Sequence, residues 1–313
     1  MTRYVIKRLL FTLVVLFGVA VIIFTILSLT PGSPVKAILG LNATPERVAE
    51  LEHRLGLDKP VYERFFLYMK GLLQGDLGTS YITNQPVGPE IFHRFKPTLI
   101  LAVCSIILSS VFGILIGVIS AVRQYSLLDD VSTVTALIVA SIPSFWLGML
   151  LVYGLSVKAG LFPPSGIGSW KNYVLPTLAL GLTGAAVIMR ITRSTMLETV
   201  RMDYIRTARA KGASEKQVIV MHALKNALLP IITVVGTTFG TLLGGTVVIE
   251  VLFGMPGLGN YLVNSILKKD MPAVMSTGLF LAALFCIIML IVDLLYAFID
   301  PRIKAKYARR AKS

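Results

Sequence analysis

Few residues of this sequence have the types and the spacing that chemistry requires. The three histidines, His53, His93 and His222, are scattered between segments that are predicted below to lie outside and inside a membrane, so they cannot form one site. The two cysteines, Cys104 and Cys286, fall inside apolar runs without the closely spaced His or Cys partners of a zinc site. No G-x-x-x-x-G-K-S/T string occurs, so the phosphate-binding loop that this motif forms is missing. The sequence therefore predicts no catalytic residue, no metal site and no cofactor bound by this chain.

Two acidic residues raise a functional question because they lie in or at the edge of apolar runs, where a charge is energetically costly. They are Glu250 and Asp293. For Asp293 the hypothesis is an ion pair with Arg190 at a similar depth, and the alternative is a bond to another helix or contact with water. Glu250 is predicted near the outer surface, where it could meet a cationic substrate or a binding protein. An acid solvated at the membrane interface is the favoured reading.

The composition is that of a membrane protein. Hydrophobic residues make up 55% of the 313 residues, charged residues only 15%, and the mean hydropathy is +0.78. Soluble domains carry roughly 25% charged residues. The net charge of +14 could suggest nucleic-acid binding. In a membrane protein such a charge more often reflects basic cytoplasmic loops, so no nucleic-acid partner is predicted.

Six apolar segments are long enough to cross a membrane, which predicts an all-α polytopic protein with six transmembrane helices. They lie at about 9–29, 98–122, 131–157, 174–191, 228–253 and 276–299. The first is too long for the apolar part of a cleaved signal peptide and is expected to be retained. Pro143 lies inside the third segment and predicts a kink there. Residues 1–97 then form one span plus an extracytoplasmic segment with two short helices, and residues 98–313 form the core.

The distribution of basic residues predicts the orientation. The short loops of one side carry only Lys158, Lys171, Lys268 and Lys269, whereas the loop 192–227 and the two ends of the chain are rich in Lys and Arg. Because basic loops stay in the cytoplasm, we expect the N- and C-termini and the loop 192–227 on the cytoplasmic side.

The central stretch 203–230 predicts a helical hairpin between two spans. It reads DYIRTARAKGASEKQVIVMHALKNALLP. A first helix is expected to end at Gly212, since glycine readily takes the left-handed conformation of a helix stop. Ser214 and Gln217 have the spacing of a capping box that opens a second helix.

This stretch resembles the EAA loop of ABC importer permeases, and most of all the loop of the dipeptide, oligopeptide and nickel group. The match consists of residues 206–208 (RTA), Gly212 and residues 228–230 (LLP). Two departures are that Arg206 stands at the acidic position and that Leu-Pro comes later than in sugar permeases. The resemblance extends over nearly the whole chain, from RYVIKRLL through GLDKP, GDLGTSY, TRSTM and PGLGNYLV to DPRI.

The resemblance implies a type I ABC importer permease fold in a bacterial inner membrane, surrounded by lipid. It implies a second permease subunit as heterodimer partner, an extracytoplasmic substrate-binding protein, and two ATPase subunits that hold ATP and Mg. The chain itself would be non-catalytic. The residues expected to form the ATPase-coupling segment are Tyr204, Arg206, Thr207, Ala208, Gly212 and Ala213.

Three glycines recur at every fourth residue of the fifth span, at Gly236, Gly240 and Gly244. Small residues at this spacing let two helix backbones approach closely in lipid. The stripe could serve helix packing within the chain. Alternatively, it could form the seam with a second permease subunit or the wall of a substrate path.

Several readings remain open. A peptide importer permease is favoured, and a nickel or metal-chelate importer permease is the same machine with another cargo. A stand-alone secondary carrier or channel is the alternative of a different class. It would predict inverted repeats and charges near the middle of the membrane, and neither is evident. The segment 30–97 is either a lid over the spans or part of a docking surface for a binding protein.

Overall fold

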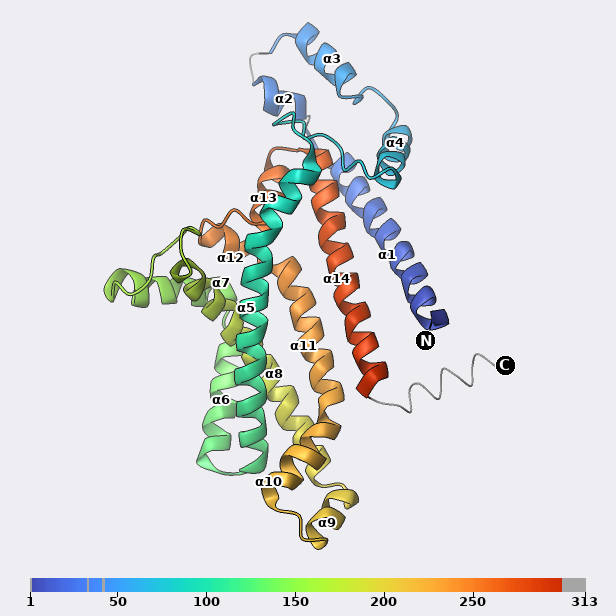
Figure 1. The fold of residues 1–313 in the computed structure, drawn as a ribbon. Coiled ribbons are helices and arrows are strands. Elements are labelled where there is room, and N and C mark those ends of the chain that lie inside the picture. The colour runs from blue at the N-terminus through green and yellow to red at the C-terminus, as the bar shows by residue number, and fades with distance from the viewer. Residues whose placement is uncertain (1, 33, 41–42, 300–313) are drawn as a thin grey trace. The chain divides into compact units, whose positions relative to one another are not determined.

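The computed structural model describes residues 2–32, 34–40 and 43–299 (Figure 1). This part of the chain is helical apart from turns and one isolated β-bridge between Thr79 and Pro86. The fold is therefore all-α, as the sequence predicted. The basic tail predicted after residue 299 lies outside the described residues.

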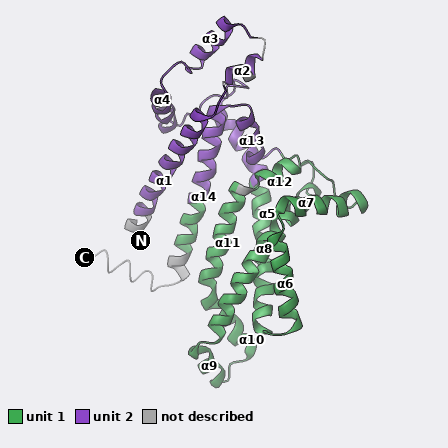
Figure 2. Ribbon diagram, turned by 180° about the vertical axis from the view of Figure 1, so that it is seen from behind, with its two compact units in different colours: residues 1, 99–255, 287–313 green, residues 2–98, 256–286 purple. Residues whose placement is uncertain are grey.

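The chain divides into two compact units (Figure 2). Unit 1 comprises residues 99–255 and 287–313 together with residue 1, and unit 2 comprises residues 2–98 and 256–286. Two long helices, α5 (Val87–Val122) and α14 (Met271–Ile299), contribute to both units.

Unit 2 contains the parts of α5 and α14 nearest residues 87 and 271 and five further helices. These are α1 (Thr2–Leu29), α2 (Pro34–Leu39), α3 (Pro45–Arg54), α4 (Val61–Leu73) and α13 (Leu258–Leu267). Helices α3 and α4 confirm the two short helices expected from the sequence within residues 1–97. The sequence also predicts Thr44 as the N-cap of the helix that starts at Pro45, but the Thr44 side chain makes no capping hydrogen bond.

Aromatic and aliphatic side chains hold α4 against α1 and α14 in unit 2. Phe65 of α4 packs edge-on against Phe24 of α1, with ring centroids 5.1 Å apart. Both belong to a cluster built on Ala20, Phe24 and Met275. The hydroxyl groups of Tyr68 and Ser276 are hydrogen-bonded at 2.9 Å, so the polar end of the Tyr68 side chain has a partner. The amphipathic stretch 61–73 is thus an integral part of unit 2.

Unit 1 contains the remaining parts of α5 and α14 and nine further helical elements. These are α6 (Leu127–Ser141), α7 (Ser144–Leu151), the π-helix η1 (Val152–Lys158), α8 (Lys171–Val200), α9 (Asp203–Ala210), α10 (Glu215–Gln217), the π-helix η2 (Val218–Leu224), α11 (Lys225–Gly245) and α12 (Val247–Leu252). Helix α8 contacts α6, α7 and α11 and is the central helix of the unit.

Glycines bring α5 and α8 into backbone contact. A Cβ atom added at Gly113 would lie 2.8 Å from the carbonyl oxygen of Ala185, and one at Gly117 would lie 2.8 Å from that of Met189. Such distances are too short for carbon and oxygen, so only glycine fits at either position. Small residues serve the same purpose in other membrane helix pairs.

Five helices are long and apolar enough to cross a membrane, and the pair α6 and α7–η1 would make a sixth. The pair is bent by 101° at its break. The expected kink at Pro143 is confirmed, but it is a break between two helices. Residue Ile142, directly before the proline, has an extended backbone (ψ 124°), the conformation that proline imposes on its predecessor.

The helix ends differ from the predicted span ends at several places. Helix α5 begins at Val87 and contains Pro97, whereas the predicted span begins at 98. Helix α8 continues to Val200, into the predicted loop. The predicted span 228–253 is two helices, because α11 ends at Gly245 and α12 begins at Val247.

Candidate functional site

The hairpin expected between α8 and α11 is confirmed. Helix α9 is followed by a turn in which Gly212 has φ +82°, the left-handed value expected for a helix stop. Ser214 and Gln217 then form both hydrogen bonds of a capping box at the start of α10. An ion pair between Arg209 and Glu215, with N–O distance 2.7 Å, joins the two arms across the turn.

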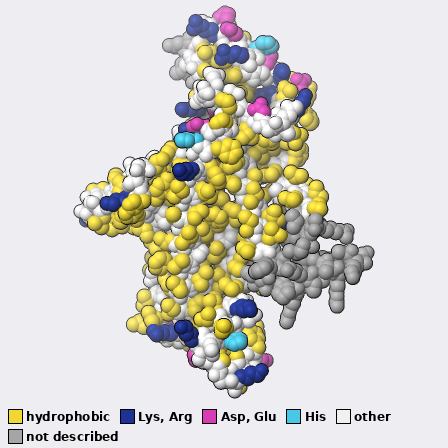
Figure 3. All heavy atoms as spheres, in the orientation of Figure 1, with side chains coloured by type: hydrophobic (Ala, Val, Ile, Leu, Met, Phe, Trp, Pro, Cys, Tyr) yellow, Lys and Arg dark blue, Asp and Glu magenta, His cyan; other side chains and the backbone are white. Residues whose placement is uncertain are grey.

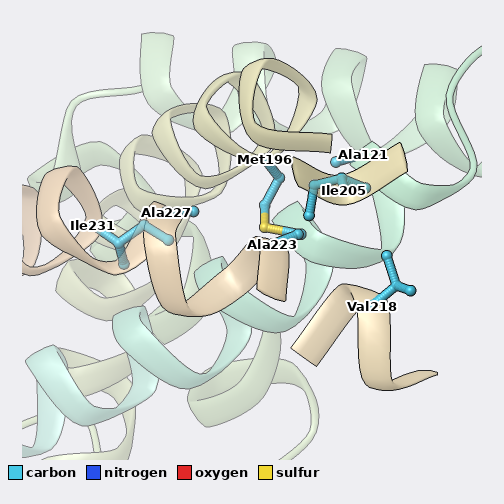
Figure 4. Packing of buried hydrophobic residues seen from close by; sticks show 7 residues of the cluster. All are labelled: Ala121, Met196, Ile205, Val218, Ala223, Ala227 and Ile231. Carbon is cyan, nitrogen blue, oxygen red and sulfur yellow. The ribbon is translucent and has the colours of Figure 1, made fainter. Parts of the chain in front are cut away.

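A hydrophobic cluster fixes this hairpin to the helices of unit 1 (Figure 4). Its buried members come from α5, α8, α9, η2 and α11; they are Ala121, Met196, Ile205, Val218, Ala223, Ala227 and Ile231. Ile205, Val218 and Ala223 have no exposed surface. Both arms of the hairpin therefore bury side chains against the bundle, and displacing the hairpin would pull on α8 and α11.

The six predicted coupling residues divide between two faces of the hairpin. Ala208 and Ala213 are partly buried and pack against the hydrophobic cluster. The remaining four are exposed; they are Tyr204, Arg206, Thr207 and Gly212. The Thr207 hydroxyl donates to the carbonyl oxygen of Asp203, 3.0 Å away, and so stays on its own helix.

Sequence reasoning missed part of the exposed face. Three further apolar residues of the hairpin region are more exposed than Tyr204, whose exposed fraction is 44%. They are Met202 at 51%, Val220 at 52% and Met221 at 64%. Lys and Arg side chains surround this end of the molecule in Figure 3. Part of the signal was present in helical periodicity, since Val218 is buried and Val220, two residues further on, points to the opposite side.

A buried ion pair lies close to the hairpin in unit 1. Asp129, in the first turn of α6, is 1% exposed, and the guanidinium of Arg193 on α8 donates to both of its carboxylate oxygens at 2.6 and 2.8 Å. The Ser120 hydroxyl and the backbone N–H of Tyr125 also donate to Asp129, at 2.5 and 3.0 Å. The end of α5, the start of α6 and the C-terminal third of α8 are thereby joined through one carboxylate.

This pair replaces the predicted one. Arg190 is exposed and makes no ion pair with Asp293, so that hypothesis is wrong for this structure. Arg193 and Arg190 are three residues apart on the same side of α8, and it is Arg193 that reaches the carboxylate of Asp129. Asp293 is partly buried and has an interaction of its own.

The prediction of a solvated Glu250 is also wrong. Glu250 is 1% exposed, and its carboxylate accepts a hydrogen bond of 2.9 Å from the Thr246 hydroxyl. The prediction assumed a continuous helix that carries Glu250 to the surface. The break after Gly245 starts a new helix, and this places Thr246 and Glu250 one turn apart on its buried side.

The glycine stripe of α11 has two different environments. A Cβ atom at Gly236 would overlap the side chain of Val292 on α14, so this glycine serves packing within the chain. Gly240 is also buried. Gly244 is exposed, and a Cβ atom there would meet nothing within 4 Å. One end of the stripe is used inside unit 1 and the other is open.

Comparison with known families decides what kind of protein this is. Residues 113–305 match the family described as "Binding-protein-dependent transport system inner membrane component", and residues 1–102 match its N-terminal membrane component. The chain belongs to this family of ABC importer permeases. It is a multi-pass protein of the bacterial inner membrane and a non-catalytic subunit, because the ATPase is a separate subunit.

Curated relatives of this permease cover it almost completely. It is 42% identical over 306 residues to the glutathione transport system permease protein GsiC of Escherichia coli strain K12, with 98% of this chain and 100% of the relative covered. The protein of the same name from Salmonella choleraesuis is 43% identical over 306 residues, with the same coverage.

Two solved structures share the fold of the permease. The inward-facing MetNI methionine ABC transporter matches with a TM-score of 0.57 and 21% identity, over 67% of this chain and 96% of that chain. An amino acid ABC transporter crystallised with histidines matches with a TM-score of 0.52 and 17% identity, over 68% and 94%. At these identities the likeness shows the fold alone.

The permease also has a groove of about 400 Å³ between α6, α8 and α11. Its polar lining consists of threonines; they are Thr183, Thr237, Thr238 and Thr241. The hydroxyls of Thr183, Thr237 and Thr241 donate to carbonyl oxygens of their own helices at 2.8–3.1 Å. Their lone pairs remain as acceptors, and no charged residue is among those that line the groove in the described part of the chain.

Proposed function

We propose that this permease subunit imports di- or oligopeptides, and that the hairpin 203–230 couples ATP hydrolysis in partner subunits to the movement of its helices. The observation that carries the coupling role is the hydrophobic cluster through which both hairpin arms are buried against α5, α8 and α11. A hairpin attached in this way moves with the bundle. An exposed hairpin held only by its ends would bend when pushed.

The peptide cargo is inferred from the relatives. A protein 42% identical over its whole length is named for glutathione transport, and glutathione is a tripeptide. Cargo selection by a separate binding protein would fit the absence of charged side chains from the groove lining in the described chain. A neutral groove with hydrogen-bond acceptors can pass peptide N–H groups without holding one side chain tightly.

The assembly we propose is a type I importer. A second permease subunit forms a heterodimer with this chain, two ATPase subunits bind ATP and Mg, and a substrate-binding protein delivers the cargo from the outside. The exposed hairpin face with Tyr204, Arg206 and Met221 meets an ATPase subunit on the cytoplasmic side, where both termini also lie. Closure of the ATPases on ATP then drives the helices between inward- and outward-open states.

Coupling is tested by Gly212→Val in the complete transporter reconstituted in liposomes. Valine is strained at φ +82°, whereas a Cβ atom there meets nothing within 4 Å. The turn is therefore distorted without a clash in the core. We expect normal assembly, continued ATP hydrolysis and much less peptide taken up per ATP hydrolysed.

The matched control is Gly168→Val, because Gly168 is also an exposed loop glycine with nothing within 4 Å of its Cβ position but has no positive φ. Transport by Gly212→Val at the rate of this control would refute the coupling role. Uptake of labelled dipeptide, tripeptide and nickel by the wild type decides the cargo. Uptake of nickel without peptide would refute the peptide assignment.

A further inference from the structure

Unit 2 contains a cavity of about 540 Å³ between α3, α4, the segment 76–81 and the start of α14. This volume lies in the range of sites for small molecules, about 300–1,000 Å³. Its charged lining is mainly basic, with Arg54, Lys59 and Arg64 against the carboxylate of Asp76. Charged side chains gather over α3 and α4 in Figure 3.

Arg64 stands out in this lining. It is partly buried on α4, and its hydrogen bond is to the sulfur of Met271, 3.1 Å from Nη2. A thioether is a weak acceptor, and no carboxylate of the described residues lies within ion-pair distance. Arg94, in the same unit, pairs with Glu90 at 2.5 Å. Arg64 therefore keeps a guanidinium fork available, the geometry that binds a carboxylate with two parallel hydrogen bonds.

Tyr81 lies on the same wall and has a fixed position. Its backbone N–H donates to Asp270, 3.0 Å away, and the hydroxyl of neighbouring Ser80 donates to the same carboxylate. Asp270 is 3% exposed, so this anchor is buried. The Tyr81 hydroxyl itself has no hydrogen-bond partner among the described residues. Burial raises the pKa of Tyr81, which keeps this hydroxyl protonated and able to donate.

Arg64 and Tyr81 also both line a second cavity of about 490 Å³ in the same unit, so they stand on the wall between two hollows. Two other basic groups of the region are already engaged. Lys269 donates to the carbonyl oxygen of Pro31, and His53 pairs with Asp58 at 2.8 Å. Arg64 and Tyr81 thus offer a ligand a guanidinium and a phenol, and the cations Arg54 and Lys59 line the first cavity beside them.

We propose that this recess binds the carboxylate of a small peptide, with the Arg64 guanidinium donating two hydrogen bonds and the Tyr81 hydroxyl a third. The peptide identity of the ligand rests on the proposed function, and the sequence predicts that the segment 30–97, which carries Arg64 and Tyr81, lies on the side from which cargo arrives. A free terminal carboxylate is common to all peptides. Recognition of this group alone gives a waiting site that is tolerant of sequence.

The test uses the complete transporter in lipid nanodiscs, without ATP and without the binding protein. Binding of alanyl-alanine and of its C-terminal amide is measured by saturation-transfer NMR. We expect Arg64→Gln to weaken binding of the dipeptide roughly 10- to 100-fold, since it removes charge-assisted hydrogen bonds. Tyr81→Phe should weaken it about 3- to 10-fold. The amide should bind the wild type as weakly as the dipeptide binds Arg64→Gln.

Lys70→Gln is the matched control, because Lys70 is an exposed cation on the same helix α4 and does not line the cavity. Arg64→Lys keeps the positive charge but loses the forked guanidinium, and its affinity for the dipeptide should lie between those of the wild type and Arg64→Gln. Equal binding of dipeptide and amide would overturn the inference. So would a loss with Lys70→Gln as large as with Arg64→Gln, or no loss with both Arg64→Gln and Tyr81→Phe.

A competition arm with inorganic phosphate separates a peptide site from a general anion site. Displacement of the dipeptide by phosphate at equal concentration would overturn the peptide assignment. If the wild type takes up peptide but neither Arg64→Gln nor Tyr81→Phe weakens dipeptide binding, the proposed site in the recess is refuted and the proposed function is not. Arg64-dependent dipeptide binding in a transporter that takes up no peptide would refute the proposed function instead.

Discussion

Two regions of unit 1 differ in how completely their side chains are used. In the first, the closed region, α5, α6 and α8 meet around the Asp129–Arg193 pair and the glycines Gly113 and Gly117. Its buried carboxylate accepts hydrogen bonds from five donor atoms, and the backbones of α5 and α8 touch. In the second, the open region, a Cβ atom at Gly244 would have no atom within 4 Å, and Tyr204 is 44% exposed.

This difference separates holding the fold from meeting partners. A closed region made of close contacts can pass a displacement from the hairpin to the helices, because packed interiors are hardly compressible. An open region leaves surface available for the other subunits of an importer. Substitutions in the closed region should therefore reduce the stability of the protein. Substitutions in the open region should reduce transport and leave stability nearly unchanged.

The largest effect is expected from Asp129→Ala. It leaves the Arg193 guanidinium partly buried without its partner, and breaking a buried pair from one side typically costs about 3–5 kcal/mol. Thermal unfolding of the purified complex measures the loss. Asp130→Ala is the control, since Asp130 is the exposed sequence neighbour. Equal unfolding temperatures for the two variants would show that the Asp129–Arg193 pair does not stabilise the closed region.

A smaller effect is expected from Gly117→Ala. The new methyl group would lie 2.7 Å from Cβ of Thr192, and overpacking of this kind costs about 1–3 kcal/mol. Gly244→Ala is the opposite case, because its methyl group meets nothing and alanine favours a helix over glycine by about 0.5–1 kcal/mol. Thermal unfolding should move in opposite directions for the two variants. A shift of both unfolding temperatures in the same direction would contradict the distinction between the closed and the open region.

The smallest effect on stability is expected from Tyr204→Ser, within about 0.5 kcal/mol, as for most surface substitutions. Its effect should appear in transport, as a lower uptake of peptide per ATP hydrolysed, because Tyr204 lies on the proposed ATPase-facing surface. Tyr125→Ser is the control, since Tyr125 is 82% exposed and lies outside the hairpin. Equal uptake by both variants would show that exposure alone does not mark a docking surface.

The parts of the hairpin that were predicted correctly depend on neighbours in the sequence. Gly212 ends α9 and Ser214 with Gln217 opens α10 through contacts that span three residues. The break at Pro143 is local in the same sense, because the missing N–H and the ring act on the adjacent turn. Its size, 101°, depends on what the two helices pack against and was not predictable.

The parts that were missed depend on contacts between distant residues. Asp129 and Arg193 are 64 positions apart, and residues 174–230 contain eight arginines and lysines that the sequence does not distinguish as partners of a buried acid. The same limit applies to Glu250, whose burial follows from a helix break that no proline announces. The two environments of Gly236 and Gly244 also depend on where α14 lies.

The sequence by itself determined that this protein is a set of apolar helices joined by a capped, basic hairpin, because hydropathy and capping depend on composition and near neighbours. Only the tertiary structure decided which arginine meets Asp129, which glycines touch another backbone, and that Arg64 keeps its guanidinium available. Pairing and close contact depend on the direction in which each side chain leaves its helix. That direction is fixed when the helices pack.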